Sequence, residues 1–110
     1  MINKTNLVLN SYVTLLASGN ASGSVPCVGR FVLAGMVWTQ NEAVTLEISE
    51  GINDYTGVEL YRDVTTFAVA AGAALRVIRD ICGKYIRVRV INTSGLNPTT
   101  IEVYFETRLR

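Results

Sequence analysis

The clearest alternation of apolar and polar residues along the chain covers residues 83–95, GKYIRVRVINTSG. Its apolar positions are Ile86, Val88 and Val90, and its polar positions are Tyr85, Arg87 and Arg89. Alternate residues of a strand point to opposite faces of a sheet. The pattern therefore predicts a strand with one buried face and one solvent-facing side. Gly83 opens this strand, and the turn residues 92–95 close it.

The last segment of the chain repeats the pattern. Its apolar positions are Ile101, Val103, Phe105 and Leu109, and its polar positions are Glu102, Tyr104, Glu106 and Arg108. We predict that the two segments are neighbouring antiparallel strands joined by a turn over residues 93–100. Their outer faces would then carry opposite charges, which favours cross-strand pairing.

Earlier segments predict further strands over residues 5–17, 25–38, 43–50, 58–62, 67–74 and 75–81. The first has a bend or bulge at Asn10-Ser11, and 67–74 also suits one turn of helix. Both faces of 25–38 are apolar, which indicates a central strand or a partner covering one side. Gly29 and Gly35 within it indicate a bulge or a close backbone approach.

Seven or eight short strands thus follow one another at spacings of roughly 8–14 residues, with turn residues between them. This pattern predicts an all-β protein with a single antiparallel β-sandwich of the jelly-roll type. We assign the sandwich to residues 25–110. Residues 18–24, SGNASGS, form a flexible connection that makes 1–24 an N-terminal arm with a hinge, or else belong to a long hairpin loop. Asn10 and Ser11 interrupt the apolar run at 7–17, so we expect a strand there and no signal peptide.

Charge and composition point away from nucleic acid and membranes. The 110 residues suit one domain, and the formal net charge of +1 gives no bulk attraction to anionic partners. No apolar run reaches the roughly 18–20 residues that a membrane-spanning helix needs. Residues 1–75 carry a net charge of −3 and residues 76–110 a net charge of +4. This asymmetry fits cross-strand pairing within a sheet, or attraction between neighbouring copies.

The chain holds 49% hydrophobic and only 17% charged residues, below the roughly 25% charged of an ordinary soluble domain. Such a chain is suited to burying surface against partners as well as within itself.

The residues needed for common catalytic sites are missing from the sequence. There is no histidine, which removes Ser-His-Asp and Cys-His nucleophiles and histidine metal sites. No glycine-rich phosphate loop is present. We therefore expect no enzyme, no catalytic residue, no cofactor and no metal site. Cys27 and Cys82 are expected to be small buried or half-buried thiols, and the sequence leaves open whether they pair.

One loop region collects oxygen ligands that could hold calcium, namely Glu50, Asn53, Asp54 and Asp63. Their spacing matches no defined calcium motif, so we interpret them as turn residues.

The predicted outer faces of the last two strands form a candidate protein interface rich in tyrosine, arginine and glutamate. Its residues are Tyr85, Arg87, Arg89, Glu102, Tyr104 and Glu106. An ordinary solvated sheet face is the alternative. The acids on this face argue against single-stranded nucleic acid. Trp38, Tyr55 and Tyr61 could instead stack on sugars.

The sequence from the Gly35–Trp38 strand through VTLEISEG (44–51) to GKYIRVRVINTSG (83–95) and a final strand resembles small jelly-roll proteins of tailed-phage virions. These include head decoration (cement) proteins and tail accessory β-sandwiches. In them a strand ending in x-S-x-G is followed by a turn, a short strand and a G-x-Y-x-R-V-x-V-x-N strand. The resemblance covers residues 31–109.

The resemblance implies a non-enzymatic assembly role on the capsid exterior, commonly as homotrimers seated on the major capsid protein and assembled in the host cytoplasm. Our leading hypothesis is therefore a capsid decoration subunit. The alternatives are a carbohydrate-binding β-sandwich module and a tail or fibre component of a phage.

Overall fold

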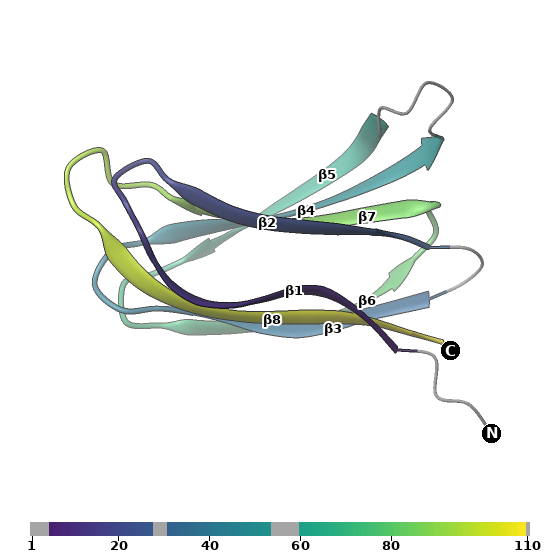
Figure 1. The fold of residues 1–110 in the computed structure, drawn as a ribbon, viewed down its shortest axis with the longest axis horizontal. Coiled ribbons are helices and arrows are strands. Elements are labelled where there is room, and N and C mark those ends of the chain that lie inside the picture. Colours follow the sequence, from purple (N-terminus) through teal and green to yellow (C-terminus); the bar gives the residue numbers. More distant parts are fainter. Residues whose placement is uncertain (1–4, 28–30, 54–59, 110) are drawn as a thin grey trace.

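The computed structural model describes residues 5–27, 31–53 and 60–109, which form eight strands (Figure 1). The strands are β1 (Thr5–Leu15), β2 (Asn20–Pro26), β3 (Phe31–Thr39), β4 (Val44–Asn53), β5 (Leu60–Val69), β6 (Ala74–Ile81), β7 (Tyr85–Asn92) and β8 (Thr99–Leu109). No helix occurs in these three ranges, and so none there could cross a membrane.

The strands form two four-stranded antiparallel sheets that lie face to face (Figure 1). Sheet A has the order β1-β8-β3-β6, and sheet B has the order β2-β7-β4-β5. Every connection except the one from β4 to β5 leads from one sheet to the other. Two four-stranded sheets connected in this way are typical of the jelly roll. The predicted all-β antiparallel sandwich is confirmed.

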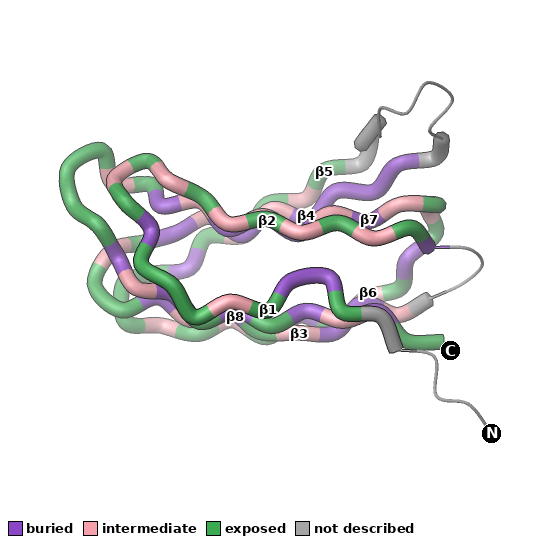
Figure 2. Tube along the Cα trace, in the orientation of Figure 1, coloured by how far each residue is buried: buried purple, intermediate pink, exposed green. Residues whose placement is uncertain are grey.

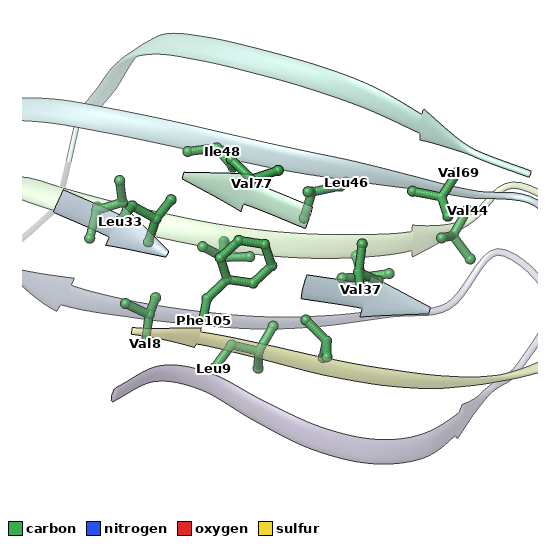
Figure 3. Close-up of a cluster of buried hydrophobic side chains, with 14 of the residues drawn as sticks. Val8, Leu9, Leu33, Val37, Val44, Leu46, Ile48, Val69, Val77 and Phe105 are labelled. Carbon is green, nitrogen blue, oxygen red and sulfur yellow. The ribbon is translucent and has the colours of Figure 1, made fainter. Parts of the chain in front are cut away.

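The core fills the space between the two sheets. In both central strands of sheet B and in β8 of sheet A, fully buried apolar residues alternate with more exposed ones (Figure 2). Ile86, Val88 and Val90 have no exposed surface, as the alternation predicts. Phe105 is the largest fully buried side chain among the residues whose burial the structure describes, and Figure 3 shows its ring in the middle of the apolar cluster. Burying a side chain of this kind stabilises the fold by about 1.5–3 kcal/mol.

Two glycines mark places where backbones approach closely. A Cβ atom at Gly35 in β3 would overlap the carbonyl oxygen of Tyr104 and the ring of Phe105. The close approach predicted for Gly35 is thus confirmed, and Gly29 lies outside the described residues. A Cβ atom at Gly23 in β2 would overlap the carbonyl oxygen of Val8 across the sandwich. Glycine is needed at both positions because no side chain fits there.

The N-terminal region is built into both sheets of the sandwich. β1 pairs with β8 in sheet A, and β2 pairs with β7 in sheet B. Most of 18–24, predicted as a flexible connection, is strand, and only a tight turn near Ser18 and Gly19 joins the two strands. The prediction failed because serine and asparagine on the solvent side of an edge strand look like a loop composition.

Strand boundaries also differ from the prediction in three places. The segment 25–38 is divided between β2 and β3, and residues 63–66, predicted as a connection, lie inside β5. The residues 67–69 end that strand, so no helical turn forms there. The bulge of β1 lies between Leu7 and Leu9, earlier than the predicted Asn10-Ser11. It turns Leu7 outward, while Val8 and Leu9 are both buried.

The predicted pairing of residues 85–92 with residues 99–109 is wrong. β7 lies between β2 and β4 in sheet B, whereas β8 lies between β1 and β3 in sheet A. The connection crosses the end of the sandwich and is held by the buried side chain of Asn92. Its Nδ2 donates to the carbonyl oxygens of Leu16 at 3.1 Å and Asn97 at 2.8 Å, and its Oδ1 accepts from Ser94 N at 3.0 Å.

Candidate interaction surfaces

The six residues of the predicted interface lie on opposite outer faces of the sandwich. One group, Tyr85, Arg87 and Arg89, belongs to β7 and points out from sheet B. The other group, Glu102, Tyr104 and Glu106, belongs to β8 and points out from sheet A. Since these strands belong to different sheets, the six side chains cannot form one surface. Each face therefore has to be considered by itself.

The outer face of sheet B carries an Arg–Glu–Arg cluster. Glu47 of β4 lies beside Arg89 in the register, and its Oε1 is 2.8 Å from Nη2 of Arg89 and 3.5 Å from Nη2 of Arg87. The arginines thus pair with an acid of their own sheet, and not with Glu102 or Glu106. The neighbouring edge strand β2 adds only small residues to this face, since Ser22 and Ser24 lie opposite the two arginines. This face is polar and internally paired.

The outer face of sheet A carries a second ion pair next to an exposed tyrosine. Arg108 donates to the Glu106 carboxylate from Nε at 3.0 Å and from Nη2 at 3.4 Å. The Arg108 guanidinium holds the pKa of Glu106 below its usual value, and a hydrogen bond with Tyr104 acts in the same direction. The same hydrogen bond to Glu106 raises the pKa of Tyr104. This trio fixes the orientation of the Tyr104 ring, which is 42% exposed.

The lowered pKa of Glu106 predicts a loss of stability in acid. A carboxyl whose pKa is lower in the folded chain than in the unfolded chain stabilises the fold at pH values above its unfolded-state pKa. That contribution is lost as the pH falls below the ordinary value of 4.5 and through the lower folded pKa. Chemical denaturation should be carried out at neutral pH and at a pH below this range. Between these two pH values, the free energy of unfolding should decrease less for Glu106→Gln than for the unchanged chain. An equal decrease in both proteins would contradict the assignment.

Apolar side chains extend around this trio over the middle of sheet A. Met36 of β3 lies opposite Tyr104, and Ile78 of β6 lies opposite Ala34. Met36 is 41% exposed and Ile78 is 70% exposed. A shallow depression of about 330 Å³ lies between these side chains and Arg76. Tyrosine, methionine and arginine are the residue types enriched in protein interfaces, so sheet A presents the better candidate surface.

Aromatic residues enlarge the same face toward β1. The register places Tyr12 of β1 opposite Glu102, and Glu102 opposite Trp38 of β3. Tyr12 is 70% exposed and Trp38 is half-buried. Tyr55 lies outside the described residues, as does the side chain of Tyr61. Tyr12 and Ile78 were not predicted as part of this face, although the alternation of β6 and the position of the β1 bulge determine their outward direction.

Glu50 has a structural role in place of the calcium role considered from the sequence. Its side chain is buried, and its Oε1 accepts hydrogen bonds from Cys82 N at 2.9 Å and Gly83 N at 2.8 Å. Its Oε2 lies 3.5 Å from Nη2 of Arg79. The carboxylate therefore closes the turn between β6 and β7. Within the described ranges, no three histidine, cysteine or acidic side chains are grouped as metal ligands, and Asp54 lies outside them.

The two cysteines are free thiols in different surroundings. Cys27 is buried as expected, and its burial, together with the charge of Glu50, raises its pKa to about 11. Cys82 is exposed, which differs from the buried or half-buried position predicted. A thiol with a raised pKa is a poor nucleophile, so Cys27 serves the core.

Comparison with known proteins identifies fold relatives. No protein-family model and no curated protein matches the chain. Among solved structures, PirA matches with a TM-score of 0.62 and 17% identity over 87% of this chain and 92% of its own. The PBSX exported protein XepA matches with a TM-score of 0.65 and 20% identity over 96% of this chain.

A structure of infectious bursal disease virus, strain Gx, matches with a TM-score of 0.53 and 9% identity over 98% of this chain. The present chain spans 36% of XepA and 33% of the viral chain, so each of these proteins has further parts. At such identities the matches establish a shared β-sandwich fold.

Proposed function

We propose that this chain is a non-enzymatic structural protein of a phage virion, a decoration or cement subunit that binds the capsid exterior. The observation that carries the proposal is the outer face of sheet A, where Tyr104, Met36 and Ile78 are exposed beside charged side chains. Exposed apolar groups with charged neighbours are typical of surfaces that bind other proteins. The major capsid protein is the proposed partner, and self-association is the second proposed contact.

The fold relatives give independent support. Sandwiches of this fold occur in the phage-derived XepA and in a virus structure, both of which are proteins of viral origin. PirA shares the fold as well, so the fold by itself does not select the function. The resemblance of residues 31–109 to decoration proteins and the composition of the sheet A face support the proposed function together.

A decoration subunit would act by binding alone. A ligand that binds the assembled shell and not its dissociated subunits stabilises the shell by mass action. A specific contact of this kind buries at least about 1,000 Å² in total. The outer face of sheet A is a four-stranded surface with strands about 4.8 Å apart and about 3.3 Å of rise per residue, so it is large enough for such a contact.

The test is co-sedimentation of the purified chain with empty shells made of the major capsid protein encoded in the same genome. The unchanged chain should pellet with shells at a fixed ratio. Ile78→Asp should remain folded, since Ile78 is 70% exposed, and should stay in the supernatant. Val64→Asp, at a 48% exposed position on sheet B, is the matched control and should pellet normally. Absence of pelleting by the unchanged chain would refute the proposal.

Carbohydrate binding is the second candidate function, and the exposure of Tyr12 favours it. Tyr12, Trp38 and Tyr104 lie on one face around Glu102, and aromatic rings beside a hydrogen-bonding carboxylate can hold a sugar. A glycan array of the purified chain tests this function. Binding that is lost in Tyr12→Ala would favour it, and an array without any bound glycan would remove it.

A further inference from the structure

One side of the sandwich is formed by two edge strands without charge. β1 ends sheet A and β2 ends sheet B, and Figure 1 shows them one above the other. The sequence from Thr5 to Pro26 contains no aspartate, glutamate, lysine or arginine. We call the surface formed by residues 7–26 the β1–β2 side.

The opposite side is protected, whereas the β1–β2 side is not. Natural sheets prevent edge-to-edge pairing with charged residues, prolines, bulges or very short edge strands. On the opposite side, β6 carries three charged residues, Arg76, Arg79 and Asp80. On the β1–β2 side, the bulge of β1 lies before Leu9 and the proline of β2 is its last residue. Regular strand without a neighbouring strand on this side therefore remains between these points.

Apolar surface accompanies these unpaired edges. Tyr12, Val13 and Leu16 are 70%, 40% and 73% exposed. Leu7 is 51% exposed, so four of the ten exposed large hydrophobic side chains of the described ranges lie within residues 7–16. A groove of about 470 Å³ runs between β1 and β2. Exposed apolar groups along an unprotected edge indicate a surface that is covered in the working form of the protein.

The spacing of the two edges restricts what can cover them. Gly23, the middle residue of β2, touches Val8 near the middle of β1, and the groove extends from there toward Leu16 and Gly19. A single added strand would pair with one edge and leave the other unpaired. A partner that covers both edges must present two strands that approach each other as closely as β1 and β2 do here. A second sandwich of the same kind presents such a pair.

We propose that the β1–β2 side is the site at which a second copy of this chain docks, with β1 antiparallel to β1 of the other copy around a two-fold axis. A two-fold contact places a surface against itself, where like charges would repel. The β1–β2 side is uncharged and avoids this repulsion. The sandwiches would then share continuous sheets.

The size of this contact is sufficient for a stable dimer. Residues 7–15 span about 30 Å at about 3.4 Å per residue, and two sheets with their side chains are about 20 Å thick. The contact then covers on the order of 600 Å² on each copy, or about 1,200 Å² in total, which exceeds the roughly 1,000 Å² in total that a specific interface needs. The inference goes beyond the proposed function, because it assigns the self-association surface independently of any shell. It predicts a dimer, whereas the resemblance to decoration proteins implies a trimer.

Sedimentation velocity of the purified full chain over a concentration series tests the proposal. The unchanged chain should sediment with twice the 12.0 kDa mass of one chain. Val13→Lys should weaken the dimer about a hundredfold, since each copy would then bury a lysine without a partner in an otherwise uncharged contact. Val64→Lys introduces the same charge at a comparably exposed valine on the opposite edge strand, β5, and should leave the dimer unchanged. Circular dichroism checks the folding of both variants.

Leu16→Lys is the second variant, because Leu16 lies in the exposed turn outside the core and can carry a charge without disturbing it. It should weaken the dimer about tenfold, and it decides the result if Val13→Lys fails to fold.

Hydrogen exchange at residues 9–15 should slow as the protein concentration rises through the dissociation constant of the dimer. A monomer at all concentrations, a trimer, or equal weakening by Val64→Lys would overturn the proposal. A monomer whose β1 amides are protected only on shells would also overturn it, and would make the capsid protein the occupant. If instead the chain dimerises but does not bind shells, only the proposed function is refuted, and the dimer proposal stands.

Discussion

Val88→Asp is expected to leave the chain unfolded. Val88 is in the middle of β7, between β2 and β4, and has no exposed surface. An aspartate there would be a buried charge without a partner, which costs several kcal/mol even after the group is protonated. The whole stability of a domain of this size is about 5–15 kcal/mol. Circular dichroism and size-exclusion chromatography should show a disordered or aggregated chain.

Val64→Asp is the matched control for this change. Val64 is 48% exposed on the outer face of sheet B, so the same substitution should change the free energy of unfolding by about 0.5 kcal/mol or less. If Val88→Asp instead unfolds cooperatively at nearly the temperature of the unchanged chain, the inward orientation of β7 is wrong.

Gly35→Ala is expected to destabilise the fold by about 3 kcal/mol or more. The added methyl group would overlap the backbone of Tyr104 in the neighbouring strand and the ring of Phe105 in the core. Neither can move freely, because Phe105 is the largest fully buried side chain and β8 pairs on both sides. Overpacking a tight core costs about 1–3 kcal/mol, and more when backbone has to shift. Urea denaturation measures the loss directly.

Gly95→Ala provides the comparison. A Cβ atom at Gly95 would have no atom within 4 Å, so the change should alter the free energy of unfolding by about 0.5 kcal/mol or less. Equal and small effects at both glycines would show that β3 and β8 are not as closely packed as the structure has them.

The direction of the side chains could largely be predicted from the sequence, because it depends on alternation alone. Leu46 and Ile48 face inward while Glu47 faces outward. In β8, Val103 likewise faces inward and Tyr104 faces outward. Alternation breaks where a bulge inserts a residue, and so Leu7 and Leu9 do not share a face although their spacing suggests it.

The pairing of strands could not be predicted in this way. Arg87 and Arg89 suit Glu102 and Glu106 as charge partners, but Glu47 offers an equal match and is the partner in the structure. Consecutive strands of a jelly roll change sheet, so proximity in the sequence does not indicate which strands pair. The polar edge strand β2 and the middle of β5 could not be recognised as strands from the sequence, because their residues lack a continuous apolar pattern.

The candidate surface was therefore predicted in part. Tyr104, Glu102 and Glu106 do share one face, but their neighbours there are Met36, Tyr12 and Ile78, which come from strands distant in the sequence. Only the register of four strands assembles this face. The assembly role itself stays a proposal that rests on this surface and on the resemblance to virion proteins.

Imaging of the virion by cryo-electron microscopy tests the assembly role most directly. We expect density for a small β-sandwich, repeated over the outer surface of the capsid, with the outer face of sheet A turned toward the major capsid protein. Density of this shape confined to the tail, or a complete particle without it, would contradict the account.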